Sequence, residues 1–141
     1  MKKDMTLAVI KPDAVSSGQV GEIIRRLEEA GFTILAMKMV KLSRNRAEEF
    51  YAVHRGEHFY DRLVEFMTEG PVVALALSRE GAVSHLREVI GDTDPRNAKD
   101  GTIRKDLAAS KERNVIHASD SAESAALEIS FFFSERELMH R

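Results

Sequence analysis

The chain has 141 residues, a length that fits one domain with a full hydrophobic core. Its 21 Lys and Arg residues against 23 Asp and Glu residues give a net charge of -2. This excludes a global positive field for nucleic acid or anionic membrane, so any anion site must be a local cluster of cations. The absence of cysteine excludes disulfides, thiolate metal ligands and thiol nucleophiles.

Apolar runs and their spacing predict alternating strands and helices. In chain order these are a strand at 5–10, a helix at 19–32, a strand at 32–42, a helical hairpin at 44–54 and 59–67, a strand at 71–77, a helix at 79–90, a strand at 114–118 and a helix at 121–133. Residues 91–113 lack sustained periodicity apart from one helical turn near 103–107, and a long irregular connection in a compact domain is usually functional. We expect Ser43, Ser78 and Asp120 to cap the helices that follow them.

This order of elements favours an α+β fold with a single domain over residues 1–141. We expect a ferredoxin-like βαββαβ sandwich: a four-stranded antiparallel sheet with helices on one face, plus a helical hairpin and a long loop. A small doubly wound parallel sheet is the alternative. The first apolar run is too short for the core of a signal peptide, and nothing later reaches membrane-spanning length, so we expect a cytoplasmic protein.

The stretch NVIHASDS, residues 114–121, places His117 between the end of a strand and the start of a helix. A histidine is largely neutral at pH 7 and is a nucleophile without a separate base. The helix start offers free N–H groups to an incoming phosphoryl group. Glu128 shares a helical face with Ser121 and is a candidate to hold the ring in one tautomer. The alternative for His117 is a structural role, which is more common for an isolated histidine. The alternative for Glu128 is a solvent-exposed acid on the helix surface.

Phosphates, if they bind, must be held by side chains, because neither GxxxxGK[ST] nor GxGxxG occurs in the sequence. The candidates lie at the first strand end, in the helix before the irregular segment, and in or beside that segment: Lys11, Arg87, Thr93, Arg104 and Asn114. Each also has an ordinary explanation as a solvated or snorkelling side chain. The remaining histidines lack zinc-ligand spacing, so a structural zinc site is not expected.

Together these stretches resemble the nucleoside diphosphate kinases. NVIHASDS is similar to the active-site signature of that family, LAVIKPDAV to its first strand and lysine, FYAVHRGEHFYDRLVEFMTEGPVVALAL to its hairpin and third strand, and GDTDPRNAKDGTIRKD to its nucleotide loop. The resemblance covers nearly the whole chain. It implies transfer of the γ-phosphate of a nucleoside triphosphate to a nucleoside diphosphate, with ATP, GTP, GDP and their deoxy forms as substrates. It further implies a ping-pong mechanism through phosphorylated His117, with Mg²⁺ bound mainly by phosphates and water.

The resemblance also implies a role for each matching position. His117 matches the nucleophile, Glu128 the carboxylate that orients it and Tyr51 a tyrosine that supports it. Phosphate and ribose contacts match Lys11, Arg87, Thr93, Arg104 and Asn114, of which Lys11 and Asn114 also count as catalytic. Phe59 and Leu63 match the surface on which the base stacks, and Ser119 and Asp120 match the signature residues after the nucleophile. Departures from the common pattern are Tyr60, Asp100, Leu107, Lys111 and Ala118.

Two other interpretations stay open at this point. One is a catalytically silent ferredoxin-like module that regulates, binds nucleotide or binds RNA. It is disfavoured, because RNA-binding versions carry aromatic residues on the sheet face and the strands 5–10 and 71–77 have none. The other is a phosphohistidine relay to another protein. Members of the family are homo-oligomers, and the apolar run 33–42 fits an edge strand that needs a partner. No membrane or nucleic-acid partner is expected.

Overall fold

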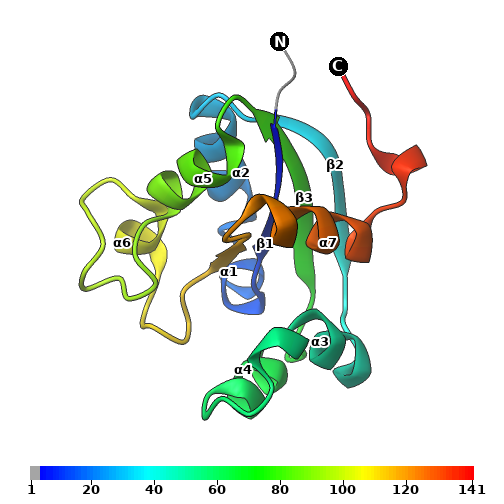
Figure 1. The fold of residues 1–141 in the computed structure, drawn as a ribbon. Coiled ribbons are helices and arrows are strands. Elements are labelled where there is room, and N and C mark those ends of the chain that lie inside the picture. Colours follow the sequence, from blue (N-terminus) through cyan, green and yellow to red (C-terminus); the bar gives the residue numbers. More distant parts are fainter. Residues whose placement is uncertain (1–3) are drawn as a thin grey trace.

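The computed structural model describes residues 4–141, and an antiparallel sheet lies at its centre (Figure 1). The strands are β1 (Asp4–Ile10), β2 (Thr33–Val40), β3 (Val72–Arg79) and β4 (Ile116–Ala118), in the order β2-β3-β1-β4. The helices are α1 (Pro12–Ser16), α2 (Val20–Glu29), α3 (Arg44–Phe50), the short 3-10 helix η1 (Ala52–His54), α4 (Tyr60–Met67), α5 (Ala82–Ile90), α6 (Ile103–Leu107), α7 (Ala122–Phe132) and the 3-10 helix η2 (Glu135–Glu137). Every neighbouring strand pair is antiparallel. The ferredoxin-like α+β prediction is therefore confirmed, and the parallel alternative is wrong.

Both faces of the sheet are apolar, and each is covered by helices. Ala8 and Ile10 of β1 pack with apolar residues of α2 and α5, whereas Leu7 and Val9 pack with residues of α7 and of the hairpin α3–α4. The expected helical layer on one face of the sheet is formed by α2 and α5. The final helix α7 lies across the opposite face (Figure 1), because the strands β1 and β3 are buried at successive positions and so present apolar side chains on both sides.

The predicted helix starts are partly correct. Ser43 caps α3 as expected, because its side-chain oxygen accepts a hydrogen bond from the Arg46 N–H. The cap predicted at Ser78 is wrong, because β3 continues through this residue to Arg79 and α5 starts later. Gly81, with φ 63°, forms the turn into α5 instead.

The start of α7 differs from the prediction by one residue. Ser121, not Asp120, caps the helix, because its Oγ accepts a hydrogen bond 3.0 Å long from the Ser124 N–H. Asp120 is exposed. Hydroxyl and carboxylate caps are nearly equivalent in strength, so the run Ser119-Asp120-Ser121 does not show which of its residues caps the helix.

The helix α1, a single turn that follows β1, was not predicted from the sequence. Lys11 stands at its N-cap position and Pro12 at its first turn, where a proline fits because no N–H is needed. The strand therefore does not end in an open loop. Its last residue leads directly into a turn that keeps Lys11 buried.

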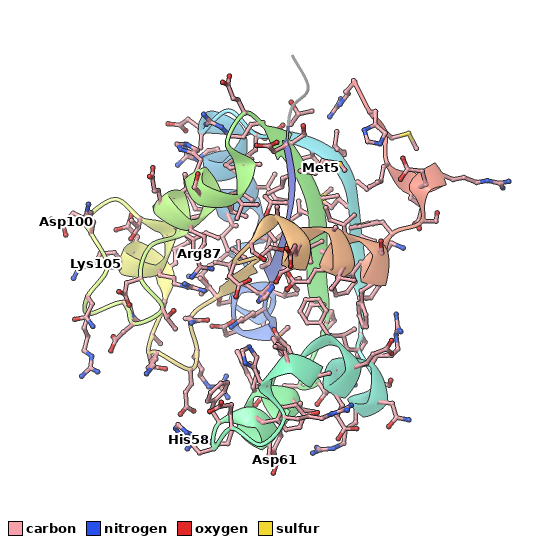
Figure 2. The ribbon with its side chains drawn as sticks, in the orientation of Figure 1. Met5, His58, Asp61, Arg87, Asp100 and Lys105 are labelled. Atoms are coloured by element: carbon pink, nitrogen blue, oxygen red, sulfur yellow. The ribbon has the colours of Figure 1, made fainter. Side chains whose placement is uncertain are left out.

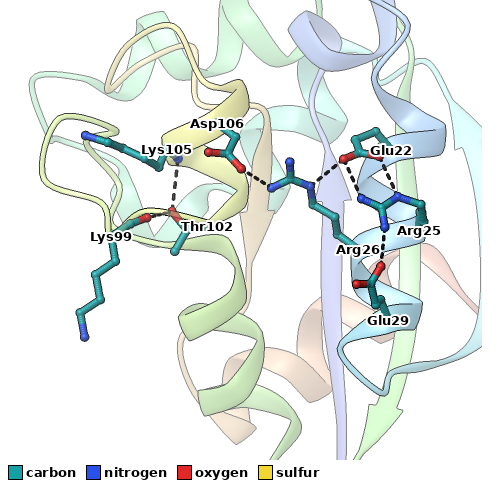
Figure 3. Close-up of polar contacts among 8 residues, drawn as sticks. All are labelled: Glu22, Arg25, Arg26, Glu29, Lys99, Thr102, Lys105 and Asp106. Atoms are coloured by element: carbon teal, nitrogen blue, oxygen red, sulfur yellow. Dashed lines mark hydrogen bonds and ion pairs between the residues drawn. The ribbon is translucent and has the colours of Figure 1, made fainter.

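The segment 91–113 is irregular apart from α6, as predicted. Thr102 caps α6 by accepting from the Lys105 N–H, and it also donates to the Lys99 carbonyl at 2.8 Å (Figure 3). Arg26 of α2 binds Asp106 of α6 at 2.7 Å (Figure 3). The irregular segment is thus tied to the helical layer through α6.

The edge strand β2 is only partly covered. The Met139 N–H donates to the Leu35 carbonyl at 2.8 Å, so the C-terminal segment runs beside the first half of the strand. In the second half, the side chains of Met37 and Met39 are 53% and 59% exposed. In the described part of the chain, residues 4–141, no helix is both long enough and apolar enough to cross a membrane.

Candidate active site

His117 lies in the middle of β4, opposite Val9 of β1. Its Nε2 atom lies 2.8 Å from Oε1 of Glu128, and each of the two side chains is 19% exposed. A carboxylate at this distance keeps the ring proton on Nε2, so Nδ1 carries the lone pair. The expected contact between Glu128 and His117 is confirmed, since α7 folds back over β4.

The surroundings of His117 favour its neutral form. Burial lowers the pKa of His117 below its usual value, and this outweighs the opposing effect of Glu128. The charges of Lys11 and Arg104 lower the pKa of His117 further. The ring is therefore unprotonated on Nδ1 at neutral pH and able to act as a nucleophile.

Ser119 donates a hydrogen bond to the Glu128 carboxylate that contacts His117. Its Oγ donates to the same Oε1 atom of Glu128 at 2.7 Å, and the residue is fully buried. One carboxylate oxygen thus accepts from both His117 and Ser119. The sequence indicated Ser119 only through its place in the stretch NVIHASDS.

Two aromatic rings enclose the histidine from the hairpin side. The ring of Tyr51 lies 5.9 Å from that of His117 at 86°, and the ring of Phe50 lies 5.2 Å away at 70°. Burial raises the pKa of Tyr51, so its hydroxyl stays protonated, and within residues 4–141 this hydroxyl has no hydrogen-bond partner. Phe50 was not among the sequence candidates, because an aromatic residue inside a helix carries no signal beyond packing.

Lys11 and Asn114 form a buried pair next to the histidine strand. Lys11 Nζ donates to Asn114 Oδ1 at 2.8 Å, and the amide nitrogen of Asn114 donates to the carbonyls of Thr93 and Lys111 at 3.2 and 3.0 Å. Burial and the neighbouring Arg104 lower the pKa of Lys11 to about 7. The Thr93 side chain is exposed at the start of the irregular segment.

Two arginines complete the cationic side of the site. Arg104, which is 7% exposed, donates to the carbonyls of Asn114, Gly91 and Ile116 at 3.3, 3.1 and 2.6 Å. Arg87 of α5 reaches the carbonyl of Ala118 at 3.4 Å. Burial and the charge of Arg87 lower the pKa of Arg104 to about 10, which leaves it charged at neutral pH. Two close guanidinium groups favour an anion between them.

Charged side chains of this region lie either near His117 or at the outer edge. Figure 2 shows Arg87 beside the strand that carries His117, whereas Asp100 and Lys105 lie at the outer edge of the segment 91–113. The position of Gly91, at the start of this segment, admits only glycine: its φ is 93°, and an added Cβ would lie 2.5 Å from Thr102 Oγ1. The backbone that brings Arg104 inward is therefore tightly packed.

The predicted base surface lies on the hairpin. Phe59 precedes α4 and contacts His54, with ring centroids 5.3 Å apart, and Leu63 is half-buried one turn further on. Two ion pairs join α4 and the turn after it to the residues before β4: Arg62 of α4 with Glu112 at 3.3 Å, and Glu69, which follows α4, with Arg113 at 3.0 Å. The hairpin thus faces the end of the irregular segment.

Comparison with known proteins identifies the family of the chain. The family model described as nucleoside diphosphate kinase matches residues 4–138. A nucleoside diphosphate kinase of Anaeromyxobacter is 53% identical over 96% of this chain and 92% of its own length, and one of Staphylothermus marinus is 51% identical over 99% of both.

Solved structures give the same result. The Aquifex aeolicus nucleoside diphosphate kinase superposes with a TM-score of 0.94 at 45% identity, covering 97% of this chain and 99% of its own. The Halobacterium salinarum enzyme, solved in complex with CDP, superposes with a TM-score of 0.95 at 35% identity, covering 99% and 93%. With the family match spanning nearly every described residue, the chain belongs to the nucleoside diphosphate kinase family.

Proposed function

We propose that this single-domain chain transfers the γ-phosphate of a nucleoside triphosphate to a nucleoside diphosphate through phosphorylated His117. The observation that carries the proposal is the 2.8 Å contact between His117 Nε2 and Glu128, which leaves Nδ1 unprotonated in the field of Lys11 and Arg104. A neutral imidazole nitrogen held in one tautomer is an activated nucleophile.

The transfer runs in two half-reactions. Nδ1 attacks the γ-phosphorus, the new N–P bond forms, and the bond from phosphorus to the bridging oxygen breaks as the diphosphate leaves. Glu128 stabilises the positive ring that results, because its negative carboxylate accepts a hydrogen bond from the Nε2–H. A terminal oxygen of a second nucleoside diphosphate then attacks the same phosphorus, the N–P bond breaks, and neutral His117 is restored.

The cations supply the electrostatic part of catalysis. In the transition state, negative charge is spread over the oxygens of the transferred phosphoryl group. The barrier is therefore lowered most by aligning the attacking and leaving atoms and by neutralising that charge. Lys11, Arg87 and Arg104 provide this neutralisation, with Asn114 fixing the Lys11 ammonium. Loss of one such preorganised group typically costs roughly 10² to 10³ in rate. Thr93 lies within this set and supplies a hydroxyl for phosphate or ribose oxygens.

Mg²⁺ fits this site as a companion of the nucleotide. In the described residues 4–141, no three His, Asp or Glu side chains converge as a metal cluster. The side chains around His117 are mainly cationic donors, which bind phosphate oxygens and not a metal. Mg²⁺ commonly binds through substrate phosphates and water, and it neutralises charge on the β- and γ-oxygens.

The hairpin supplies the base surface. Phe59 and Leu63 offer an apolar wall on α4 and the turn before it, and the CDP complex of the Halobacterium relative supports a nucleotide in this fold. Because stacking uses the π face that every base has, we expect ATP, GTP, GDP and their deoxy forms all to be substrates. Tyr51 supports the His117 ring through edge contact.

We further propose that the chain forms a homo-oligomer through the open half of β2, where Met37 and Met39 are exposed. An uncovered strand edge with apolar side chains favours pairing with another chain. The cytoplasmic location stays a prediction.

Labelling tests the function directly. Incubation with γ-labelled ATP should give an acid-labile, base-stable phosphoprotein, and added GDP should remove the label as GTP. His117→Ala should not be labelled; labelled His117→Ala would exclude this residue as the nucleophile. Label that leaves only when a protein acceptor is added would support the relay instead, and equal kinase activity of wild type and His117→Ala would support the silent module.

A further inference from the structure

The residue two positions before His117 has an unusual backbone conformation. Val115 has a φ of 65°, and among the described residues it is the only one other than glycine with a positive φ. The Ile116 N–H donates to the Asn114 carbonyl at 2.8 Å, so these three residues form a tight turn. A β-branched residue in this conformation is strained and persists only where its surroundings hold it. Val115 is also buried, at 2% exposure.

Groups from two other parts of the chain hold this turn. The Lys11 N–H donates to the Val115 carbonyl at 2.8 Å, and Arg104 donates to the carbonyls on either side of it. The remaining polar group of Val115 is its N–H, which donates to Asp13 Oδ2 at 3.1 Å. Asp13 is thus the side chain that satisfies the central N–H of the strained turn.

The turn sets the spacing of the site. Asn114, on one side, accepts from the Lys11 ammonium, and Ile116, on the other, leads into His117. If the Val115 N–H lost its acceptor, a buried donor would be unpaired and the extended backbone conformation would become preferred. Asn114 and His117 would then shift relative to each other.

We propose that Asp13 is a positioning residue for phosphoryl transfer, because its carboxylate holds the Val115 turn and through it the relative placement of Asn114 and His117. The proposal rests on the function proposed above for His117. Asp13 acts through the backbone and does not touch the substrate.

The charge of Asp13 also acts on the site, through Lys11. Within the described residues, Oδ1 is buried without a hydrogen-bond partner, which is unusual for a carboxylate and costs free energy. Its negative charge acts on Lys11, where it raises the pKa against the effects of burial and of Arg104. The charged or titratable groups facing Lys11 are therefore Asp13 from α1, Arg104 from α6 and His117 from β4.

Three substitutions separate these roles. Asp13→Ala removes acceptor and charge, Asp13→Asn keeps an acceptor oxygen without the charge, and Val115→Gly removes the strain, because glycine adopts a positive φ freely. Glu29→Ala, an exposed carboxylate on α2, is the control. A misplacement of about 1 Å costs roughly 10² in rate, so Asp13→Ala should lower kcat by about this factor.

The combined variant provides the decisive result. Asp13→Ala with Val115→Gly should recover most of the lost kcat, because the turn no longer needs its acceptor. Asp13→Asn should keep kcat near wild type but move the alkaline limb of kcat/KM to lower pH, since Lys11 loses a supporting negative charge. Unchanged kcat in Asp13→Ala overturns the proposal, and so does a loss that Val115→Gly does not reduce.

Amide exchange of Val115 separates this proposal from the proposed function. The Val115 N–H should exchange faster in Asp13→Ala than in wild type and in Asp13→Asn, whether or not the wild type transfers phosphate. Absence of transfer by wild type would refute the function, whereas equal exchange in all variants would refute the role of Asp13. Melting temperatures of the variants identify a general loss of stability, which Glu29→Ala should not show.

Discussion

Oε1 of Glu128 lies 2.8 Å from Nε2 of His117, although the two residues belong to different elements on one face of the sheet. In the proposed mechanism, this contact determines which ring nitrogen attacks, and it places a negative charge where positive charge would develop. Ser119 donates to the same oxygen and so limits how the carboxylate can rotate.

Replacement of Glu128 by glutamine should slow phosphorylation of His117. The amide keeps the size of the side chain but carries no charge to stabilise the ring, and it can also select the wrong tautomer. We expect the single-turnover rate with ATP to fall by roughly 10² to 10⁴. Glu123→Gln, an exposed acid in the first turn of the same helix, is the matched control. Similar losses in both variants would contradict the role of Glu128.

Ser119→Ala should lower the stability of the fold, because it removes a hydrogen bond to the Glu128 carboxylate. The substitution removes one of the two donors on Glu128 Oε1 in a fully buried position. Hydrogen bonds to charged groups are worth about 1.5–3 kcal/mol, so the free energy of unfolding should fall by about that amount. Chemical denaturation measures it, and Ser124→Ala at a partly buried site of α7 serves as the control. An unchanged free energy of unfolding would show that the contact contributes nothing.

The sequence predicted the sheet well because β1 and β3 are unbroken apolar runs between clear stop signals. It predicted β4 two residues too long, since Asn114 and Val115 belong to the turn and a valine normally favours a strand. Asp13 was not among the residues that the sequence predicted for the site. Its partner is the backbone of a residue 102 positions later, and no local pattern encodes such a contact.

In the candidate site, too, some residues follow from local sequence patterns and others depend on contacts that no local pattern encodes. Helical periodicity placed Glu128 on the same face as Ser121 and so made it a candidate partner of His117, and the fold of α7 decides that the two residues meet. Arg104 lies in a segment without periodicity, so only the family resemblance distinguished it from other loop arginines. The structure accounts for its inward position by three backbone carbonyls, which have no sequence signature.

The pH dependence of kcat/KM should reflect Lys11. Its pKa is about 7, so the ammonium is charged below that pH and loses its charge as the pH rises further. We therefore expect kcat/KM to fall on the alkaline side. His117, with its lowered pKa, limits activity only in more acidic solution. A profile from about pH 5 to about pH 9 tests this. In Lys11→Gln the fall of kcat/KM at alkaline pH should disappear. If the variant shows the same fall as wild type, another group causes it.

The ion pair between Arg26 and Asp106 should affect nucleotide binding more than stability. The pair is partly exposed, so it contributes about 0–1 kcal/mol to folding, but it fixes the helix that carries Arg104 (Figure 3). We expect Asp106→Asn to raise KM severalfold with little change in kcat, and the difference to shrink at high salt. Glu29→Gln, whose partner Arg25 lies on the same helix, should leave KM unchanged. A fall in kcat alone would contradict this role.

The open half of β2 should mediate self-association. Met39 is 59% exposed on the edge strand, and a charge there would oppose pairing with a second chain. Light scattering should show an oligomer for wild type and a smaller species for Met39→Glu. Leu127→Glu, at a site on α7 that is 75% exposed, controls for added charge on an apolar surface residue and should leave the mass unchanged. If wild type is a monomer at all concentrations, the edge strand is not an interface; if only Leu127→Glu dissociates, the interface lies on α7 instead.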